Sequence, residues 1–261
     1  MPQHLQVEVL TSQPVGTDTC LLKLKAPDLA RAARPGQFVH LLCGEGRDPL
    51  LRRPLSIHDA GGGEVTLFYQ VKGRGTSWLS RRQPGSRVDL LGPLGRGFTL
   101  VAGGRLALMA GGLGMAPLFF LARVAREIGN TVDFFYGARD RQGLHRLEDL
   151  EGLGVRLYLA TDDGSAGLHG SVTALWEQQL QGRVYDRAYA CGPRPALAAF
   201  ARLAAAAGIP AEVSLEERMA CGFGACRGCV TALRDARGEK YYENVCTGGP
   251  VFDAAAVCWE D

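Results

Sequence analysis

Short hydrophobic runs with partial alternation of apolar and polar positions fill the first part of the chain. They predict five strands, at residues 6–10, 20–25, 37–42, 65–71 and 88–90. Turn residues separate these runs, including Pro35-Gly36 and Pro84-Gly85. Several short strands at this spacing are typical of an antiparallel barrel or sandwich. We therefore expect an all-β domain over residues 1–101.

From Gly103 onward, apolar runs alternate with stretches of helical periodicity. The predicted strands lie at 105–110, 131–137, 155–161 and 185–191. The predicted helices lie at 117–128, 147–153, 172–180 and 195–207. Ser171 can cap the start of the third helix, and Gly208 can close the fourth. Alternating strands and helices imply a parallel α/β sheet, which we expect over residues 102–211.

The remaining segment, residues 212–261, is rich in cysteine and glycine, with a hairpin expected around residues 235–238. Four of its cysteines follow the spacing Cys221-x4-Cys226-x2-Cys229-x16-Cys246. This is the ligand spacing of a plant-type 2Fe–2S cluster. Because such a cluster moves single electrons, the spacing indicates an electron-transfer protein whose metal ligands are these four thiols.

Two alternatives to the cluster are a structural zinc site and unliganded thiols. Structural zinc sites usually contain two separate C-x2-4-C pairs, whereas here Cys246 is single and the four cysteines do not divide into two such pairs. Small residues around the cysteines also allow the tight wrapping that a cluster requires, namely Gly222, Gly224, Ala225 and Gly228. These features favour 2Fe–2S. Cys20, Cys43 and Cys258 have no partner at a useful spacing, and we interpret them as buried apolar residues.

Composition and charge exclude several classes of protein. Among 261 residues, 21% are charged and the net charge is +2, which gives no basis for nucleic-acid binding. No apolar stretch reaches the roughly 18 residues that a membrane span requires. The N-terminus lacks the basic and apolar regions of a signal peptide, so we expect a cytoplasmic protein. In that compartment its 8 cysteines are unlikely to form disulfides.

A glycine-rich turn follows the first strand of the predicted α/β domain. It runs from Gly112 to Pro117, between that strand and the next helix. Glycines in this position allow a pyrophosphate to approach the start of the helix, although a plain tight turn is the alternative. Residues 136–139, 161–164 and 191–193 follow the other three strands. Since parallel strands end at one edge of the sheet, we expect a nucleotide crevice there.

The β-rich part also carries groups that suit a phosphate. Residues 52–56 contain two arginines and a serine, and residues 69–77 contain Lys72, two glycines and the hydroxyls of Thr76 and Ser77. A surface arginine and a hairpin loop are the plain alternatives. A chemical argument favours a flavin, because nicotinamide exchanges two electrons whereas a 2Fe–2S cluster takes one, and flavin can do both. The β-rich domain is the part of the chain left to hold it.

These motifs resemble the ferredoxin-NADP reductase superfamily and, more closely, the electron-transfer subunits of class 1B dihydroorotate dehydrogenases. The resemblance covers essentially the whole chain. It rests on residues 53–56, 75–76, 111–117, 136–139, 161–165, 191–193, the cysteine loop and 245–252. Thr247-Gly248 stands where a more polar or charged pair is expected, but this difference does not affect any of the four cysteine ligands. The resemblance implies a Greek-key flavin-binding barrel, a parallel α/β nucleotide-binding domain and a small C-terminal 2Fe–2S subdomain.

The resemblance also implies the cofactors and their residues. FAD would lie on the barrel, on Arg53, Pro54, Leu55, Ser56, Gln70, Val71, Lys72, Gly75 and Thr76. NAD would lie at the α/β crevice, on Gly111, Gly112, Gly114, Ala116, Pro117, Cys191, Gly192 and Pro193. The 2Fe–2S cluster would be held by Cys221, Cys226, Cys229 and Cys246. Arg139 could hold the 2′-phosphate of NADP, but Asp162 and Asp163 would repel it, so we expect NAD.

The implied partner is a separate, FMN-containing catalytic subunit of dihydroorotate dehydrogenase, in a heterotetramer of two plus two. Electrons would pass from that FMN through 2Fe–2S and FAD to NAD⁺, in pyrimidine biosynthesis. No part of this chain suggests a dihydroorotate site, and we predict no catalytic residue in it. The five histidines are scattered, and we interpret each as structural or exposed.

Two alternative functions remain at this point. The same subunit architecture resembles the NAD(P)H-oxidising subunits of soluble hydrogenases and of ferredoxin-NADP oxidoreductases. A zinc-stabilised nucleotide-binding module without a redox role is an alternative from another class.

Overall fold

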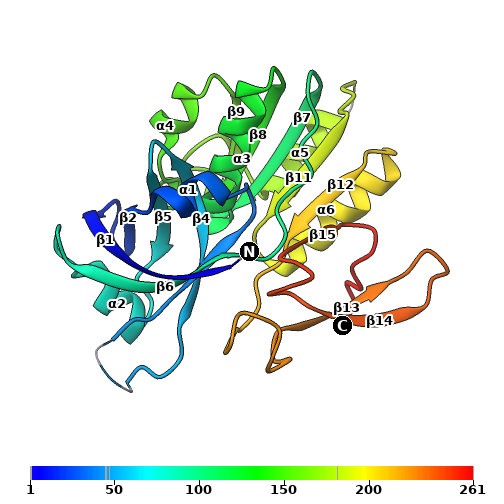
Figure 1. The fold of residues 1–261 in the computed structure, drawn as a ribbon. Helices are drawn as coiled ribbons and strands as arrows, with labels where there is room; N and C mark the ends of the chain where they lie inside the picture. The colour runs from blue at the N-terminus through cyan, green and yellow to red at the C-terminus, as the bar shows by residue number, and fades with distance from the viewer. Residues whose placement is uncertain (1, 45, 47, 181, 261) are drawn as a thin grey trace.

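The computed structural model describes residues 2–44, 46, 48–180 and 182–260. Figure 1 shows an N-terminal barrel beside a sheet covered by helices on both faces. The C-terminal segment, drawn in orange and red, lies below that sheet and next to the barrel. Among the helices of the described part of the chain, none is both long and apolar enough to cross a membrane.

The N-terminal domain is a closed antiparallel barrel, as the fold prediction required. Its strands pair in the order β1-β2-β5-β4-β3-β6, and β6 returns to β1. Their bounds are β1 Gln3–Pro14, β2 Thr19–Lys25, β3 Phe38–Leu41, β4 Arg53–Gly61, β5 Glu64–Gln70 and β6 Arg87–Leu94. Two short helices, α1 Pro27–Ala32 and α2 Arg74–Ser80, interrupt the strands. Alternate strand residues form its core, as in Leu22 and Leu24 of β2, both fully buried.

Two elements of the barrel differ from the sequence prediction. No strand was predicted at residues 53–61, but they form β4, where Pro54 pairs with His40 and Ser56 with Phe38. The proline and the preceding arginines hide the alternation of apolar positions that identifies a strand. Residues 74–80 form α2, a helix that was not predicted, and the hairpin loop given as the plain alternative is not found there. A helix of two turns has too short a periodic pattern to be recognised from sequence.

The second domain contains a seven-stranded sheet with the order β10-β9-β8-β7-β11-β12-β15. All neighbours pair in parallel except β15, which runs antiparallel to β12 at one edge. The strands are β7 Arg105–Gly111, β8 Thr131–Ala138, β9 Arg156–Thr161, β10 Leu168–His169, β11 Arg187–Cys191, β12 Ala211–Ser214 and β15 Val251–Asp253. The sheet confirms the predicted parallel α/β fold.

The helices of this domain follow the predicted positions within a few residues. They are α3 Met115–Glu127, α4 Leu147–Gly152, α5 Val172–Leu180 and α6 Arg194–Ala206. The Ser171 hydroxyl accepts a hydrogen bond from the backbone N–H of Ala174 at 3.2 Å, which confirms the predicted cap of α5. Gly208 adopts a φ of +66° after α6, as expected of a residue that ends a helix.

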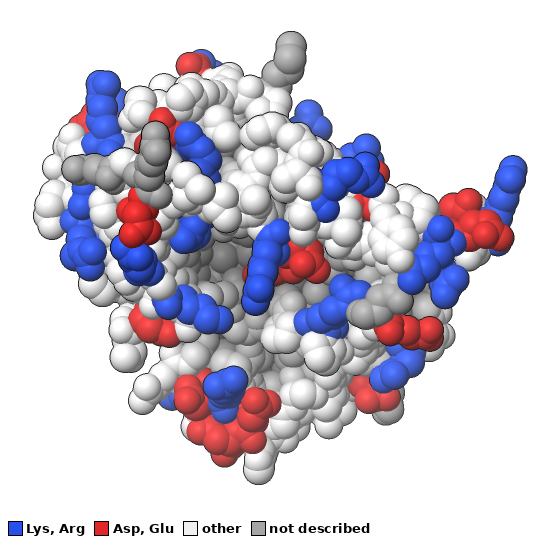
Figure 2. All heavy atoms as spheres, turned by 90° about the horizontal axis from the view of Figure 1, so that it is seen from below, with Lys and Arg blue, Asp and Glu red and all other residues white. Residues whose placement is uncertain are grey.

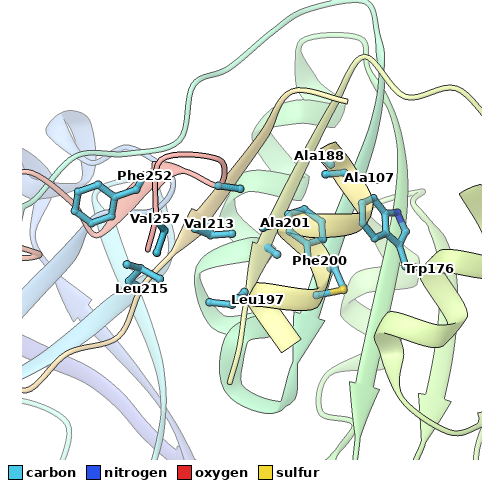
Figure 3. Close-up of a cluster of buried hydrophobic side chains, with 14 of the residues drawn as sticks. Ala107, Trp176, Ala188, Leu197, Phe200, Ala201, Val213, Leu215, Phe252 and Val257 are labelled. Atoms are coloured by element: carbon cyan, nitrogen blue, oxygen red, sulfur yellow. The ribbon is translucent and has the colours of Figure 1, made fainter. Parts of the chain in front are cut away.

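The C-terminal segment continues from the α/β sheet rather than forming a core of its own. After β12 come the cysteine loop and the predicted hairpin, formed by β13 Val230–Arg234 and β14 Lys240–Asn244. The chain then returns as β15 to pair with β12. Phe252, Val257 and Leu215 belong to one buried cluster with Val213 of β12 and Leu197 of α6 (Figure 3). This shared core fixes the cysteine loop relative to the nucleotide-binding edge of the sheet.

Aromatic side chains join the barrel to the α/β domain. His58 of β4 is fully buried, and its Nδ1 donates a hydrogen bond to the backbone oxygen of Ala116 at 2.9 Å. Its ring stacks on Phe119 of α3 at 4.5 Å between centroids. Burial, with the nearby Arg146 charge, lowers the pKa of His58 to about 3. The interface therefore requires a neutral histidine.

The His58 contact predicts an acid-dependent loss of stability. Between its ordinary pKa and about 3, the unfolded chain takes up a proton that the folded chain cannot, so unfolding becomes more favourable as pH falls. His58→Asn retains an N–H donor and removes this titration. From pH 7 to pH 5, the wild type should lose about 2 kcal/mol more unfolding free energy than the variant. Urea denaturation at both pH values measures this, and equal losses would contradict it.

Candidate functional site

Two adjoining cavities lie where the barrel, the α/β domain and the C-terminal segment meet. The face seen from below is hollowed near its centre, with basic and acidic side chains beside the hollow (Figure 2). The first cavity has a volume of about 270 Å³ and the second about 850 Å³. Residues from all three parts line the first cavity, so it exists only in the assembled fold.

The first cavity is mostly apolar and is bounded by β4 and β5 on the barrel side. Six of the residues predicted to bind cofactors line it: Pro54, Leu55, Ser56, Gln70, Lys72 and Ala116. Aromatic residues Phe38, Phe68 and Tyr69 add apolar walls, and Ser214 to Glu217 close it from the α/β side. A flat ring system with a polar edge suits such a space, because Ser56 and Gln70 offer hydrogen bonds among apolar surfaces. The residues present therefore fit a flavin ring.

Arg53, Gly75 and Thr76 lie together beside this cavity at the start of α2. A Cβ on Gly75 would meet the Arg53 Nε at 2.9 Å, so the guanidinium lies directly against the glycine backbone. The Thr76 Oγ1 accepts hydrogen bonds from the backbone N–H groups of Lys72 at 3.0 Å and Gly73 at 3.2 Å. An arginine next to an open glycine backbone can hold a phosphate oxygen. Val71 is half-buried between this group and β5.

The second cavity collects the ends of the parallel strands. Gly111 ends β7, Gly112 and Gly114 follow it, and Gly192 and Pro193 follow β11, all lining the cavity. Residues 137–140, at the end of β8 and just after it, and Asp162 after β9 also line it. The carboxyl ends of parallel strands are the usual position of a nucleotide crevice. A space of about 850 Å³ with glycines at a helix start fits a dinucleotide.

Close packing explains the glycines of this edge. A Cβ on Gly114 would lie 1.9 Å from the backbone oxygen of Cys191, and one on Gly111 would lie 2.8 Å from Pro193. The Cys191 thiol is buried, which raises its pKa, and it lies in the core rather than in the cavity lining. Pro117 is buried in the first turn of α3. Neither Cys191 nor Pro117, both predicted to bind NAD, is among the residues that line the crevice.

Four residues line both cavities: Gln70, Lys72, Leu113 and Glu216. They mark the point at which a ring in the first cavity and a nicotinamide in the second would meet. The sequence prediction did not include Leu113 and Glu216 among the site residues. Surrounding protein atoms raise the pKa of Glu216, and the charge of Lys72 opposes this effect. No sequence motif marks Glu216 as a site residue. Only its position between the two cavities in the folded chain identifies it.

The cysteine loop brings its thiols together at the end of β12. Cys229 and Cys246 are buried, Cys221 is half-buried and Cys226 is exposed. The backbone N–H groups of Cys226 and Gly228 donate to the Sγ atoms of Cys221 and Cys226, each at 3.4 Å. Burial raises the pKa of Cys221, but the N–H groups of residues 223, 225 and 226 outweigh it and lower this pKa to about 6. The loop is therefore built to hold thiolate charge.

The four thiols also interact with one another. Burial and then the neighbouring thiol of Cys229 raise the pKa of Cys246 to about 12, and the Cys221 charge adds to this. Mutual repulsion of this kind is relieved by bound metal ions. Among the described residues, no three His, Cys, Asp or Glu side chains are grouped to hold one metal ion. A 2Fe–2S cluster distributes four thiolates over two irons, and the donor set and N–H···S bonds present fit it.

A histidine of the barrel contacts the cysteine loop. His40 of β3 is fully buried, and burial lowers its pKa to about 4, so its ring is neutral near pH 7. Its Nδ1 lies 3.2 Å from the backbone oxygen of Cys221. The loop is thus anchored to the barrel as well as to the α/β domain. The hydrogen bonds described for His4, His58 and His145 are made to Asp89, Ala116 and Tyr136, which lie outside the cysteine loop.

Residues 216–258 match the family described as the iron-sulfur cluster binding domain of dihydroorotate dehydrogenase B. The chain is 41% identical over 263 residues to a protein of Desulforamulus reducens, covering all of both chains. It is 42% identical over 257 residues to one of Geobacillus thermodenitrificans, covering 97% of each. Both carry the name dihydroorotate dehydrogenase B (NAD(+)), electron transfer subunit.

Solved structures share the fold. A structure of the NADH-dependent reduced ferredoxin-NADP oxidoreductase, described for flavin-based electron bifurcation, superposes with a TM-score of 0.87 at 28% identity, covering 98% of this chain and 91% of that one. A ferredoxin NADP⁺ reductase of Neisseria gonorrhoeae with bound FAD and NADP superposes with a TM-score of 0.64 at 18% identity, covering 78% and 92%. At 18% identity, the similarity to the Neisseria gonorrhoeae structure shows only that the two proteins share a fold.

Proposed function

The chain belongs to the family of dihydroorotate dehydrogenase B electron transfer subunits, and from this premise we propose that it carries electrons between a catalytic partner and NAD. Electrons pass from FMN in the partner through 2Fe–2S and FAD to NAD⁺, in the oxidation of dihydroorotate to orotate for pyrimidine biosynthesis. The observation that carries the proposal is the contiguity of three sites. The apolar cavity, the strand-end crevice and the cysteine loop adjoin one another in one fold.

We propose that residues 1–101 bind FAD, residues 102–211 bind NAD and residues 212–261 hold the cluster. Bound FAD supplies the exchange between electron pairs and single electrons. Ser56 and Gln70 orient the ring by hydrogen bonds, Phe38 and Phe68 exclude water, and Arg53 with the backbone of Gly75 and Thr76 holds phosphate. Lys72 and Glu216 lie where the two cavities meet and balance each other's charge.

On the nucleotide side, Gly111, Gly112 and Gly114 admit the pyrophosphate, and Gly192 and Pro193 form the opposite wall. At the C-terminal end, Cys221, Cys226, Cys229 and Cys246 hold the cluster. The exposed Cys226 indicates the side from which single electrons enter. The complex with the FMN-containing subunit is a heterotetramer of two plus two in the cytoplasm, where reducing conditions keep the thiols available.

The proposal is tested with the chain alone and with its partner. Loaded with FAD and iron–sulfur, the chain alone should oxidise NADH with an artificial dye and leave dihydroorotate unchanged. Adding the FMN-containing catalytic subunit should produce NADH from dihydroorotate and NAD⁺. Turnover of dihydroorotate by the chain alone would contradict the proposal, as would a colourless protein loaded with zinc.

The relatives favour this function over the alternatives. The NAD(P)H-oxidising subunit of a ferredoxin-NADP oxidoreductase shares the architecture, but the similarity to that structure is 28% identity, against 41% for the dihydroorotate dehydrogenase B subunit. A zinc module without redox role has no counterpart in the family match, which concerns an iron-sulfur domain. An apolar cavity whose lining suits a flavin ring, next to the nucleotide crevice, also supports a redox function.

The preference for NAD over NADP should depend on Asp162. Arg139 and Asp162 line the same cavity, so the attraction of a 2′-phosphate by one is opposed by the other. Asp162→Asn removes the negative charge at similar size and should raise kcat/KM for NADPH roughly tenfold, equivalent to about 1.4 kcal/mol. The value for NADH should change less than about twofold. Steady-state dye reduction measures both, with Glu148→Gln on the exposed face of α4 as control. Unchanged NADPH use would rule out this source of selectivity.

A further inference from the structure

His40 connects the flavin side of the barrel to the cysteine loop. This inference rests on the proposed function, because it concerns the passage of electrons between the two sites. β3 contributes Phe38 to the wall of the apolar cavity and His40 to the contact with Cys221. The two residues are separated by one position, so their side chains leave the strand on the same side. They pair with Ser56 and Pro54, which also line the cavity.

The hydrogen bond to the loop fixes the state of the His40 ring. The backbone oxygen of Cys221 can only accept, so Nδ1 at 3.2 Å carries the proton and donates it. Nε2 is then an acceptor, and it is buried without a hydrogen-bond partner among the described residues. A fully buried imidazole with one directed donor holds a single orientation, so it can fix the position of the carbonyl that it contacts.

The loop fits this histidine closely. A Cβ on Gly222 would lie 2.4 Å from the His40 Nδ1, and Gly222 adopts a φ of +79°. Glycine is favoured here both by the backbone conformation and by the close approach of the ring. Arg52 donates from Nη1 to the His40 backbone oxygen at 3.4 Å and pairs with Asp89 at 2.5 Å. Arg52 and Asp89 therefore fix the His40 backbone on the barrel side, and Gly222 leaves room for the His40 ring on the loop side.

We propose that His40 is a positioning residue for electron transfer, which holds the Cys221 end of the loop against the flavin-binding barrel. It sets the separation and relative orientation of the flavin ring site and the Cys221 thiolate. The step concerned is the transfer of one electron at a time between these sites. Two such transfers balance the pair that leaves with a proton as hydride to NAD⁺. Loss of the contact lets the loop move away, so the rate of this step falls.

The test uses the holoprotein and two substitutions. His40→Leu removes the donor and retains an apolar side chain, whereas His40→Asn places an amide donor near the position of Nδ1. Stopped-flow reduction by NADH should show unchanged flavin reduction in both. Reduction of the cluster by flavin should slow at least tenfold in His40→Leu and return to within about threefold of wild type in His40→Asn. The electron paramagnetic resonance spectrum of the reduced cluster should broaden in His40→Leu only.

Controls separate this inference from the proposed function. His169→Leu alters an exposed histidine of β10 that lines neither cavity and should leave every rate unchanged. If His40→Leu loses a cofactor, Gly222→Ala displaces the loop from the other side and should give the same slow step. A wild-type rate in His40→Leu, or a failure of His40→Asn to restore it, would overturn the inference. A wild-type protein whose flavin is not reduced by NADH would instead contradict the proposed function.

Discussion

Cys246→Ser should abolish the iron–sulfur cluster while leaving NADH oxidation by the flavin intact. Cys246 lies far from the other three cysteines in sequence, yet it is buried and interacts with Cys229 and Cys221. A serine hydroxyl is a poor substitute for thiolate because its proton is far harder to remove, so one iron would lose a ligand. Cluster content should fall at least tenfold, since changes merely next to metal ligands already cost about 10- to 100-fold.

The matched control is Cys258→Ser. Cys258 is also buried, at 6% exposure against 1% for Cys246, and it lies in the same C-terminal segment outside the ligand set. Any cost of burying a hydroxyl therefore affects both variants, whereas loss of the cluster affects only Cys246→Ser. Iron and acid-labile sulfide content, visible absorption and dye reduction by NADH distinguish the outcomes. Equal cluster content in the two variants would remove Cys246 from the ligand set.

The strands that could be predicted from the sequence are those whose burial leaves a recognisable local pattern of apolar residues. Strands such as β7 and β8 are buried on both faces, so they appear in sequence as continuous apolar runs between helical stretches. β4 and α2 were not predicted, because Pro54 hides the alternation of the strand and the helix has only seven residues. β15 was not predicted either. It has three residues, and it pairs with β12, a strand distant in sequence.

The predictable part of the site follows from topology and spacing. Strand ends such as Gly112 and Gly192 could be assigned to one cavity because parallel strands end at one edge. The cysteine spacing specified a cluster without any knowledge of the fold. Glu216 and His40 could not be found in this way. Each is a single polar residue without a motif, and its role depends on contacts with residues far away in sequence.

Gly114→Ala should disrupt the nucleotide crevice through a steric effect alone. Gly114 has a φ of −57°, which any residue can adopt, so the substitution adds no backbone strain. The new Cβ would lie 1.9 Å from the oxygen and 2.4 Å from the carbon of the Cys191 carbonyl. These are backbone atoms that cannot rotate away, so the glycine loop and the end of β11 must separate. Gly112, Gly192 and Pro193 line the cavity on either side of this contact.

The expected consequence is a weaker affinity for NADH together with a lower stability. KM for NADH should rise at least roughly tenfold, equivalent to about 1.4 kcal/mol, while FAD and cluster content remain near wild type. The unfolding free energy should fall by about 1–3 kcal/mol, the usual cost of overpacking. Gly152→Ala is the matched control, because a Cβ there meets no atom within 4 Å. It should change stability by less than about 0.5 kcal/mol. A Gly114→Ala protein with wild-type KM would show that the close packing of this loop against Cys191 does not shape the NAD site.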